Sequence, residues 1–141
     1  MDNINFSVKL NEGKFETKYE LLSELPLKMR VEITKQTSKD IIEKFSFFQN
    51  SDSVFIAIII PLLQNIIMNK NEIIYKIYDL AYTMFFIEEG IVCFLSKHQH
   101  IYRLYKEGFY FGDIELVLKI PRISTAKCVT NCKLLILSKE T

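Results

Sequence analysis

Residues 111–126, F-G-D-I-E-L-V-L-K-I-P-R-I-S-T-A, combine a glycine turn, a short apolar helix and an arginine in one compact segment. Gly112 allows the backbone to approach a ligand closely, and the amides of a helix that begins at about Asp113 have no partners within that helix. Arg122 returns a guanidinium from the far end of the segment. Main-chain donors and a guanidinium together satisfy a phosphate, so the segment predicts an anion site.

The segment resembles the phosphate-binding cassette of cyclic nucleotide-binding domains. That cassette usually reads F-G-E, an apolar residue, a small residue, L, and then P-R or R-R a few positions later, and the match has no gap. The resemblance implies that Asp113 binds the ribose 2′-hydroxyl and that Arg122 binds the cyclic phosphate. The resemblance implies that the binding residues in this segment are Phe111, Gly112, Asp113, Ile114, Arg122 and Ile123.

The same resemblance places the base near Phe94 and Tyr105, whose aromatic faces can stack on a purine. The residues themselves leave a second interpretation open, in which both rings complete the hydrophobic core. Ile123 stands where channels that favour cyclic GMP often have a hydroxyl, and an isoleucine cannot donate to guanine. We therefore expect a preference for cyclic AMP over cyclic GMP.

Glu115 is the main departure, because the family has a small residue at this position. Two unit charges about 5 Å apart at an effective dielectric near 20 interact by roughly 3 kcal/mol. A charge-assisted contact between Arg122 and a phosphate contributes about 1.5–3 kcal/mol, which is comparable. Glu115 then cancels the contribution of the arginine, or lies over the helix N-terminus and Arg122 as a built-in substitute for the ligand, or points into solvent and leaves the pocket intact. The sequence leaves these alternatives open.

Two stripes of apolar residues at helical spacing predict two amphipathic helices before residue 50. The stripes are Leu22, Leu25, Met29 and Ile33, and Ile41, Ile42, Phe45 and Phe48. The segments L-P-L-K-M-R-V-E-I at 25–33 and F-F-Q-N at 47–50 resemble the end of the linker between pore and nucleotide domain in cyclic nucleotide-gated, hyperpolarisation-activated and related potassium channels. The resemblance implies linker helices over 21–62 that contact neighbouring subunits of a homo- or hetero-tetramer. The charges on these helices are equally explained by a solvated face.

The most apolar run, 54–68, is too short for a membrane-spanning helix, which needs about 20 apolar residues. Asp52 and Ser53 can cap a helix that begins after them and ends near Pro61, with a buried strand following from Leu63. No membrane contact is therefore expected except through channel segments that this sequence does not contain.

Short β-branched and aromatic runs between polar or glycine turns predict an antiparallel roll. The predicted strands are 63–68, 72–78, 83–88, 90–96, 101–106, 124–130 and 132–138. The run M-F-F-I-E-E-G-I-V at 84–92 resembles a hairpin of the same family, with Gly90 at its turn. The predicted fold class is α+β: a polar segment over 1–20, the helices, and a jelly-roll-like β-roll over 63–141 with a short phosphate-cassette helix.

Composition and motifs argue against several other functions. With 18 basic and 17 acidic residues and a net charge of +1, the chain lacks the broad cationic surface that binds nucleic acid. Cys93, Cys128 and Cys132 lack metal-ligand spacing and are expected to be buried or edge-strand thiols, which favours a reducing cytoplasm. His98 and His100 at a predicted hairpin tip have no third ligand nearby. No nucleophile has an activating arrangement, so we expect a protein without catalytic activity, cofactor or metal.

The sequence predicts a cytoplasmic regulatory domain at the inner face of a membrane, which couples cyclic AMP or cyclic GMP occupancy to gating of a potassium-type cation channel. The family pattern continues into two lid helices beyond Thr141, so we expect this fragment to bind weakly and switch poorly. The alternative is a degenerate roll that acts as an assembly or scaffold module, with Glu115 occupying the anion site.

Overall fold

The computed structural model describes residues 24–138. The predicted polar segment over 1–20 and Leu22 of the first apolar stripe lie outside the described residues. The chain divides into two compact units, of which one ends at Asn65 and the other begins at Ile66.

Short helices make up most of the described part of the first unit. They are α2 (Leu27–Thr37), α3 (Lys39–Lys44), α4 (Ser46–Gln49), α5 (Ser53–Ile59) and the 3-10 helix η1 (Ile60–Leu62). The carbonyl of Pro26 accepts from the amide of Met29 at 3.0 Å at the start of α2. The predicted cap of α5 is present, because Asp52 Oδ1 accepts from the amide of Val54 at 3.3 Å.

Two details of the predicted helices are wrong. Met29 is 51% exposed, whereas Thr34 of the same helix is buried, so the face of α2 that packs inward is not the apolar stripe. The second helix is interrupted at Phe45, which has extended backbone (φ −106, ψ 116) between α3 and α4. Phe45 and Phe48 are both fully buried, with ring centroids 6.4 Å apart. Burying two such rings contributes about 3–6 kcal/mol, which outweighs the roughly 1 kcal/mol of a lost helical hydrogen bond.

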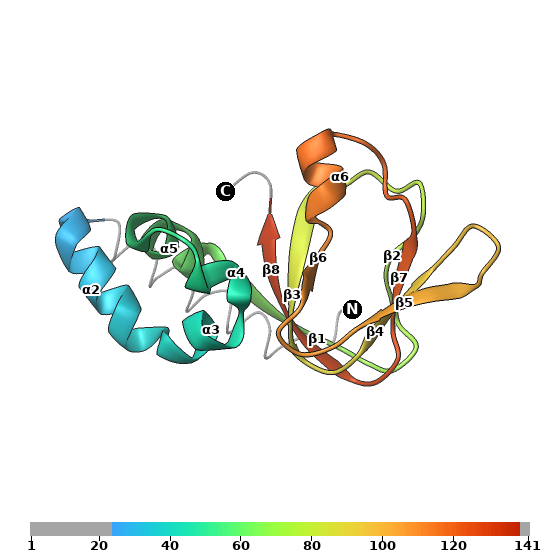
Figure 1. Cartoon of the computed structure of the whole chain (residues 1–141), viewed down its shortest axis with the longest axis horizontal. Helices are drawn as coiled ribbons and strands as arrows, with labels where there is room; N and C mark the ends of the chain where they lie inside the picture. Colours follow the sequence, from blue (N-terminus) through green and yellow to red (C-terminus); the bar gives the residue numbers. More distant parts are fainter. Residues whose placement is uncertain (1–23, 139–141) are drawn as a thin grey trace. The chain divides into compact units, whose positions relative to one another are not determined.

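Two four-stranded sheets make up the roll (Figure 1). One sheet has the order β1-β8-β3-β6 and the other β2-β7-β4-β5. Their bounds are β1 (Gln64–Met68), β2 (Ile73–Tyr75), β3 (Thr83–Glu89), β4 (Val92–Leu95), β5 (Ile101–Tyr105), β6 (Tyr110–Phe111), β7 (Thr125–Cys128) and β8 (Cys132–Ser138). Helix α6 (Asp113–Leu118) connects β6 to β7 at one end of the two sheets. The predicted α+β roll is therefore confirmed.

The core of the roll lies between the sheets and draws on both. It comprises Met68, Phe85, Ile87, Val92, Phe94, Phe111, Ala126, Cys128, Cys132 and Leu134. All seven predicted strands are present, and only the two-residue β6 was not predicted, because two residues are too few to show an alternating pattern. The expectation that the strand after Leu63 is buried was wrong: β1 is an edge strand whose residues, apart from Met68, are exposed or half-buried.

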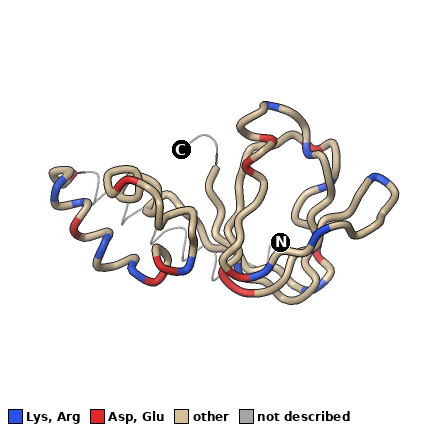
Figure 2. The backbone as a smooth tube through the Cα atoms, viewed as in Figure 1, with Lys and Arg blue, Asp and Glu red and all other residues tan. Residues whose placement is uncertain are grey.

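The three cysteines are buried and free, as predicted. Burial is the main cause that raises the pKa of the Cys128 thiol to about 12, and the neighbouring Cys132 raises it further. The charged residues of both signs are interspersed within each unit (Figure 2). Among residues 24–138, no helix is long and apolar enough to cross a membrane.

Gly90 forms the predicted turn between β3 and β4 and has φ 107. A Cβ at this position would lie 2.6 Å from the carbonyl oxygen of Asn131 and 2.7 Å from Sγ of Cys132. The turn therefore depends on the absence of a side chain for two reasons, the positive φ and the close approach of the β7–β8 hairpin.

We predict that Gly90→Ala lowers the free energy of unfolding by about 2–4 kcal/mol, because the left-handed backbone alone costs about 1–2 kcal/mol and the steric overlap adds to it. Urea denaturation of the parent and the variant measures the difference. A loss below about 1 kcal/mol would show that the crowding around this turn is not as described.

Candidate functional site

The candidate site begins at the junction between β6 and α6. Gly112 has φ 86, and this left-handed residue turns the chain so that α6 starts at Asp113. A Cβ at Gly112 would lie 3.0 Å from Nη1 of Arg122 and 3.2 Å from the carbonyl oxygen of Thr83. The glycine therefore makes room for the guanidinium of Arg122, and not only for a ligand.

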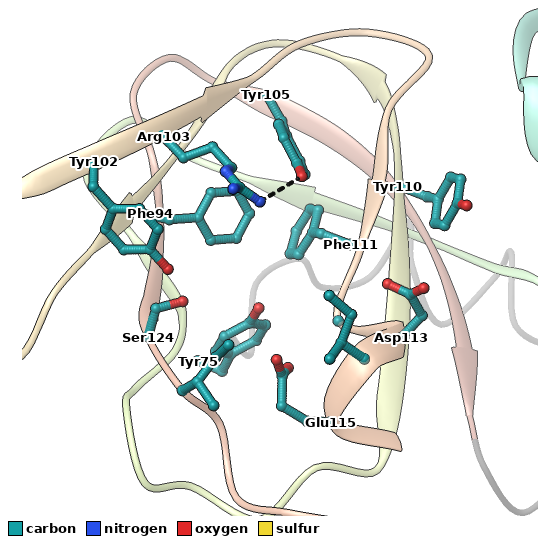
Figure 3. A pocket seen from close by; sticks show the side chains of 13 residues that line it. Tyr75, Phe94, Tyr102, Arg103, Tyr105, Tyr110, Phe111, Asp113, Glu115 and Ser124 are labelled. Atoms are coloured by element: carbon teal, nitrogen blue, oxygen red, sulfur yellow. Dashed lines mark hydrogen bonds between the residues drawn. The ribbon is translucent and has the colours of Figure 1, made fainter. Parts of the chain in front are cut away.

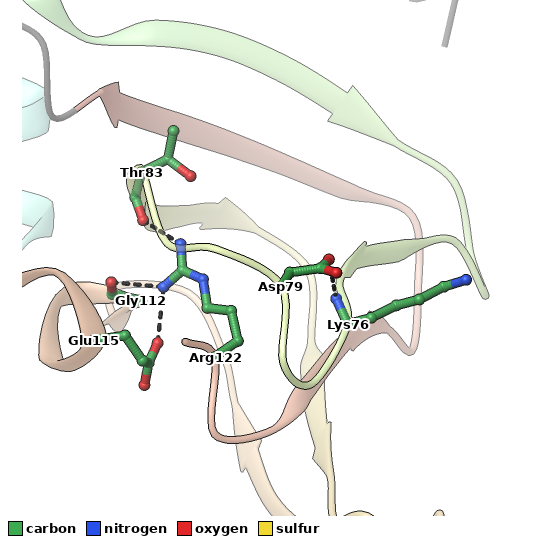
Figure 4. A network of polar contacts seen from close by, with 6 residues as sticks. All are labelled: Lys76, Asp79, Thr83, Gly112, Glu115 and Arg122. Carbon is green, nitrogen blue, oxygen red and sulfur yellow. Dashed lines mark hydrogen bonds and ion pairs between the residues drawn. The ribbon is translucent and has the colours of Figure 1, made fainter. Parts of the chain in front are cut away.

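Arg122 is 2% exposed and lies at the base of this turn. Its Nη1 donates to the carbonyl oxygen of Gly112 and to Oε1 of Glu115, both at 2.8 Å. Its Nη2 donates to the carbonyl oxygen of Thr83 at 2.5 Å (Figure 4). Its Nε is buried and has no hydrogen-bond partner among the described residues. The guanidinium is thus held by two main-chain carbonyls and one carboxylate.

The backbone of Arg122 is held by the loop after β2. The amide of Arg122 donates to the carbonyl of Asp79, and the amide of Tyr78 donates to the carbonyl of Arg122, both at 2.8 Å. The Asp79 carboxylate accepts from the amide of Lys76 at 2.9 Å, which closes the loop (Figure 4). These two hydrogen bonds fix the backbone position of Arg122. Its guanidinium then reaches the carbonyl of Thr83, which is 39 residues away in the sequence.

Glu115 lies on α6 with its side chain only 6% exposed, paired with Arg122 at 2.8 Å. The alternative in which it points into solvent is therefore wrong. A carboxylate here supplies the negative charge that a phosphate would bring to the same guanidinium. Breaking such a buried pair by removing one partner leaves the other charge uncompensated, which typically costs about 3–5 kcal/mol.

Tyr75, at the end of β2, lies against the other side of the guanidinium. The Cζ atom of Arg122 is 4.1 Å from the centroid of the Tyr75 ring, within the range of a cation–π interaction. Burial raises the pKa of the Tyr75 phenol above its usual value, the Glu115 charge raises it further, and Arg122 opposes the shift. The phenol therefore stays protonated throughout the physiological pH range.

A pocket of about 70 Å³ opens beside this ion pair. Six aromatic rings line it, together with the polar side chains Arg103, Asp113, Glu115 and Ser124 (Figure 3). Arg122 is not among the lining residues, because Glu115 lies between it and the pocket. The volume is below the roughly 300–1,000 Å³ typical of small-molecule sites, so a ligand of nucleotide size requires this pocket to open.

The family model for the cyclic nucleotide-binding domain matches residues 67–141, just over half of the chain. The chain belongs to the cyclic nucleotide-binding domain family. This family is defined by ligand binding, in agreement with the prediction that the protein is not an enzyme.

Curated relatives include potassium/sodium hyperpolarization-activated cyclic nucleotide-gated channels. Channel 3 of Homo sapiens is 25% identical over 129 residues, covering 92% of this chain and 16% of the relative. Channel 2 of Mus musculus is 27% identical over the same length, covering 92% and 15%. The chain therefore spans about a sixth of the relatives that it matches.

Solved structures with the same fold include protein kinase A regulatory subunits. The cAMP-bound PfPKA-R has a TM-score of 0.69 and 23% identity, over 78% of this chain and 39% of that chain. A mutant regulatory subunit of a cAMP-independent protein kinase A from Trypanosoma brucei, bound to cAMP in its A site, has a TM-score of 0.67 and 12% identity, over 77% and 42%. These similarities show the fold alone.

The structure brings the residues predicted for the cyclic nucleotide site together around the pocket, with the exception of Arg122. Phe94, Tyr105 and Phe111 form a cluster in which the Phe94 ring centroid is 5.1 Å from that of Tyr105 and 5.2 Å from that of Phe111. Phe94 and Phe111 also belong to the core and Tyr105 packs against it, so the two interpretations of these rings are compatible. Ile114 and Ile123 are half exposed at the pocket.

Five lining residues were not predicted from the sequence: Tyr75, Tyr102, Arg103, Tyr110 and Ser124. Tyr110 immediately precedes the cassette segment and Ser124 lies within it, so the sequence contains a signal for both. Tyr102 and Arg103 lie on the predicted strand of Tyr105, and Nη1 of Arg103 donates to the Tyr105 hydroxyl at 3.1 Å. Tyr75 has no local signal, because it meets Arg122 only through the pairing of distant strands.

We predict that Glu115 and Arg122 are strongly coupled in stability. Arg122→Met leaves a buried carboxylate without a cation and should cost about 3–5 kcal/mol. Adding Glu115→Gln should recover part of this loss, giving a coupling of at least about 1.5 kcal/mol in a double-mutant cycle measured by urea unfolding.

The exposed pair Lys39–Glu43, 4.0 Å apart, provides a matched control. The same substitutions, Lys39→Met and Glu43→Gln, should couple by less than about 0.5 kcal/mol. Additive effects of the Glu115 and Arg122 substitutions would contradict a buried ion pair at the site.

Proposed function

We propose that this chain is the cytoplasmic cyclic nucleotide-binding regulatory domain of a potassium-type cation channel, and that Glu115 holds the anion site while no ligand is bound. The observation that carries the proposal is the guanidinium of Arg122, buried beneath the turn at Gly112 and held there by main-chain carbonyls. A buried, positioned cation requires an anion; Glu115 is that anion in the free domain, and the family to which the chain belongs binds a cyclic phosphate that would take its place.

The pocket offers contacts for the remaining parts of the ligand. The half-buried Asp113 is proposed to accept from the ribose 2′-hydroxyl, and Phe94 and Tyr105 to stack on the base. Ile123 is 54% exposed at the pocket and has no donor for guanine, which supports cyclic AMP as the preferred ligand.

Charge balance determines how the ligand enters. A cyclic phosphate carries one negative charge, as does Glu115, and a single guanidinium balances only one of them. Two unit charges about 5 Å apart repel by roughly 3 kcal/mol at an effective dielectric near 20. Glu115 must therefore move away from Arg122 before the phosphate takes its place, and this exchange weakens binding.

The Trypanosoma brucei mutant carries substitutions at the same spacing as Glu115 and Arg122. The mutant bound to cAMP carries alanine in place of a glutamate and, seven positions later, arginine in place of a threonine. Glu115 and Arg122 have the same separation, 115 to 122. In this chain both the glutamate and the arginine are native residues, so the obstructing and the binding group occur together.

The curated relatives support the channel context. In them the domain is part of a gated channel, so we propose a location at the inner face of a membrane, with assembly as a homo- or hetero-tetramer through the first unit. Occupancy of the pocket would then bias the pore through the helices α2 to α5.

The buried ion pair also favours a second candidate function. If Glu115 never leaves Arg122, the pocket binds no anion and the domain serves as an assembly or scaffold module. The near-complete burial of both side chains supports this candidate.

Calorimetric titration with cyclic AMP and cyclic GMP separates the two functions. For the regulatory domain, we predict weak binding by the parent, binding about 10- to 100-fold tighter by Glu115→Ala, and no binding by Arg122→Ala. Cyclic AMP should bind more tightly than cyclic GMP in every variant that binds.

Glu107→Ala is the matched control, because Glu107 is an exposed glutamate of the same unit that does not line the pocket. It should leave the affinity unchanged within about twofold. Absence of heat in the parent and in Glu115→Ala, with the fold intact, would reject the regulatory domain and leave the scaffold module.

A further inference from the structure

Tyr75 combines two features that the proposed function does not use. Its ring lies 4.1 Å from Cζ of Arg122 and packs against Phe85 and Phe111, at centroid distances of 5.9 Å and 6.1 Å. Its hydroxyl points into the pocket, on the side where the Glu115 carboxylate lies (Figure 3). Within residues 24–138, no hydrogen bond to this hydroxyl is formed, so a donor is directed at the pocket without an acceptor.

Arg122 alone leaves part of a bound phosphate unmatched. Nη2 donates to Thr83, Nη1 donates to Gly112 and to Glu115, and Nε is buried without a hydrogen-bond partner among residues 24–138. A cyclic phosphodiester shares its negative charge between two non-bridging oxygens. One of them can replace Glu115 Oε1 on Nη1, and the second, which accepts more than one hydrogen bond, can take a further donor in addition to the main-chain amides at the start of α6.

We propose that Tyr75 is a further binding residue of this site, whose hydroxyl donates to the second non-bridging oxygen of the cyclic phosphate once Glu115 has moved away. The inference rests on the proposed function, since it concerns the same ligand. The Tyr75 ring has a positioning role as well. It lies against one face of the Arg122 guanidinium, which must stay in place while the Glu115 carboxylate is exchanged for the phosphate.

The chemistry of the phenol suits this role. A neutral phenol donates a hydrogen bond without adding charge, so it binds an anion without attracting Glu115 as strongly as a second cation would. Burial, and then the Glu115 charge, raise the pKa of Tyr75, so the donor remains protonated when the anion arrives.

Tyr75→Phe tests the hydroxyl while keeping the ring, its packing and its contact with Arg122. Binding of cyclic AMP is measured by calorimetry in the parent and in the Glu115→Ala background. We expect the loss of the hydroxyl to weaken binding about 10- to 100-fold in both, as for a hydrogen bond to a charged group. Tyr102→Phe, which removes another hydroxyl that lines the pocket, should change affinity by less than about twofold.

The two phosphorothioate diastereomers of cyclic AMP supply a readout that a structural role would not change. Each replaces one non-bridging oxygen by sulfur, which is a poorer acceptor. For the diastereomer whose sulfur faces Tyr75, the effect of Tyr75→Phe should fall below about threefold, while the other diastereomer should show the full loss.

The outcomes separate this inference from the function on which it rests. Unchanged affinity of Tyr75→Phe, with the parent binding cyclic AMP, overturns the role of Tyr75 and leaves the proposed function standing. An equal loss for both diastereomers also overturns it, because the hydroxyl would then act through the fold. If neither the parent nor Glu115→Ala binds a nucleotide, the proposed function fails and this inference fails with it.

Discussion

A buried guanidinium has to be surrounded by acceptors, and the end of this roll at which α6 lies is organised around that requirement. Gly112 supplies both a carbonyl and the space in which Arg122 lies, and Thr83 supplies a second carbonyl from the start of β3. The ring of Tyr75 covers one face of the cation, and Glu115 balances its charge. One side chain therefore contacts residues of β2, β3, the turn after β6 and α6, which helps the cassette to form without a ligand.

In this member of the family, Glu115 changes which interactions would determine the affinity for the proposed ligand. When the anion site is empty of side chains, binding gains the full attraction between phosphate and arginine. Under the proposed function one anion would replace another on Arg122, so the two attractions would largely cancel and the remaining contacts would decide the affinity. Under this proposal Arg122 is required for binding, and the donors and rings around the pocket determine which ligand binds most tightly. Such a domain would respond only to a ligand whose contacts outweigh those between Glu115 and Arg122.

Much of the fold could be predicted from local sequence patterns, and the misses have physical causes. Alternating β-branched and aromatic runs located the strands, and β8 has the predicted bounds, Cys132–Ser138. The break at Phe45 was not predictable, because it arises from burial of two rings and not from local propensity. The cassette located Gly112, Asp113 and Arg122. It left the direction of Glu115 open, and it gave no sign of Tyr75, which reaches Arg122 because β2 pairs with β7, the strand that follows the arginine in the chain.

A crystal structure of the domain grown with cyclic AMP tests the central claim most directly, because the claim concerns which anion lies on Arg122. We predict a non-bridging phosphate oxygen within hydrogen-bond distance of Nη1 of Arg122, at the place where Oε1 of Glu115 lies in the free domain, with the glutamate side chain turned away. A nucleotide bound in the pocket while the ion pair between Glu115 and Arg122 remains intact would contradict the account.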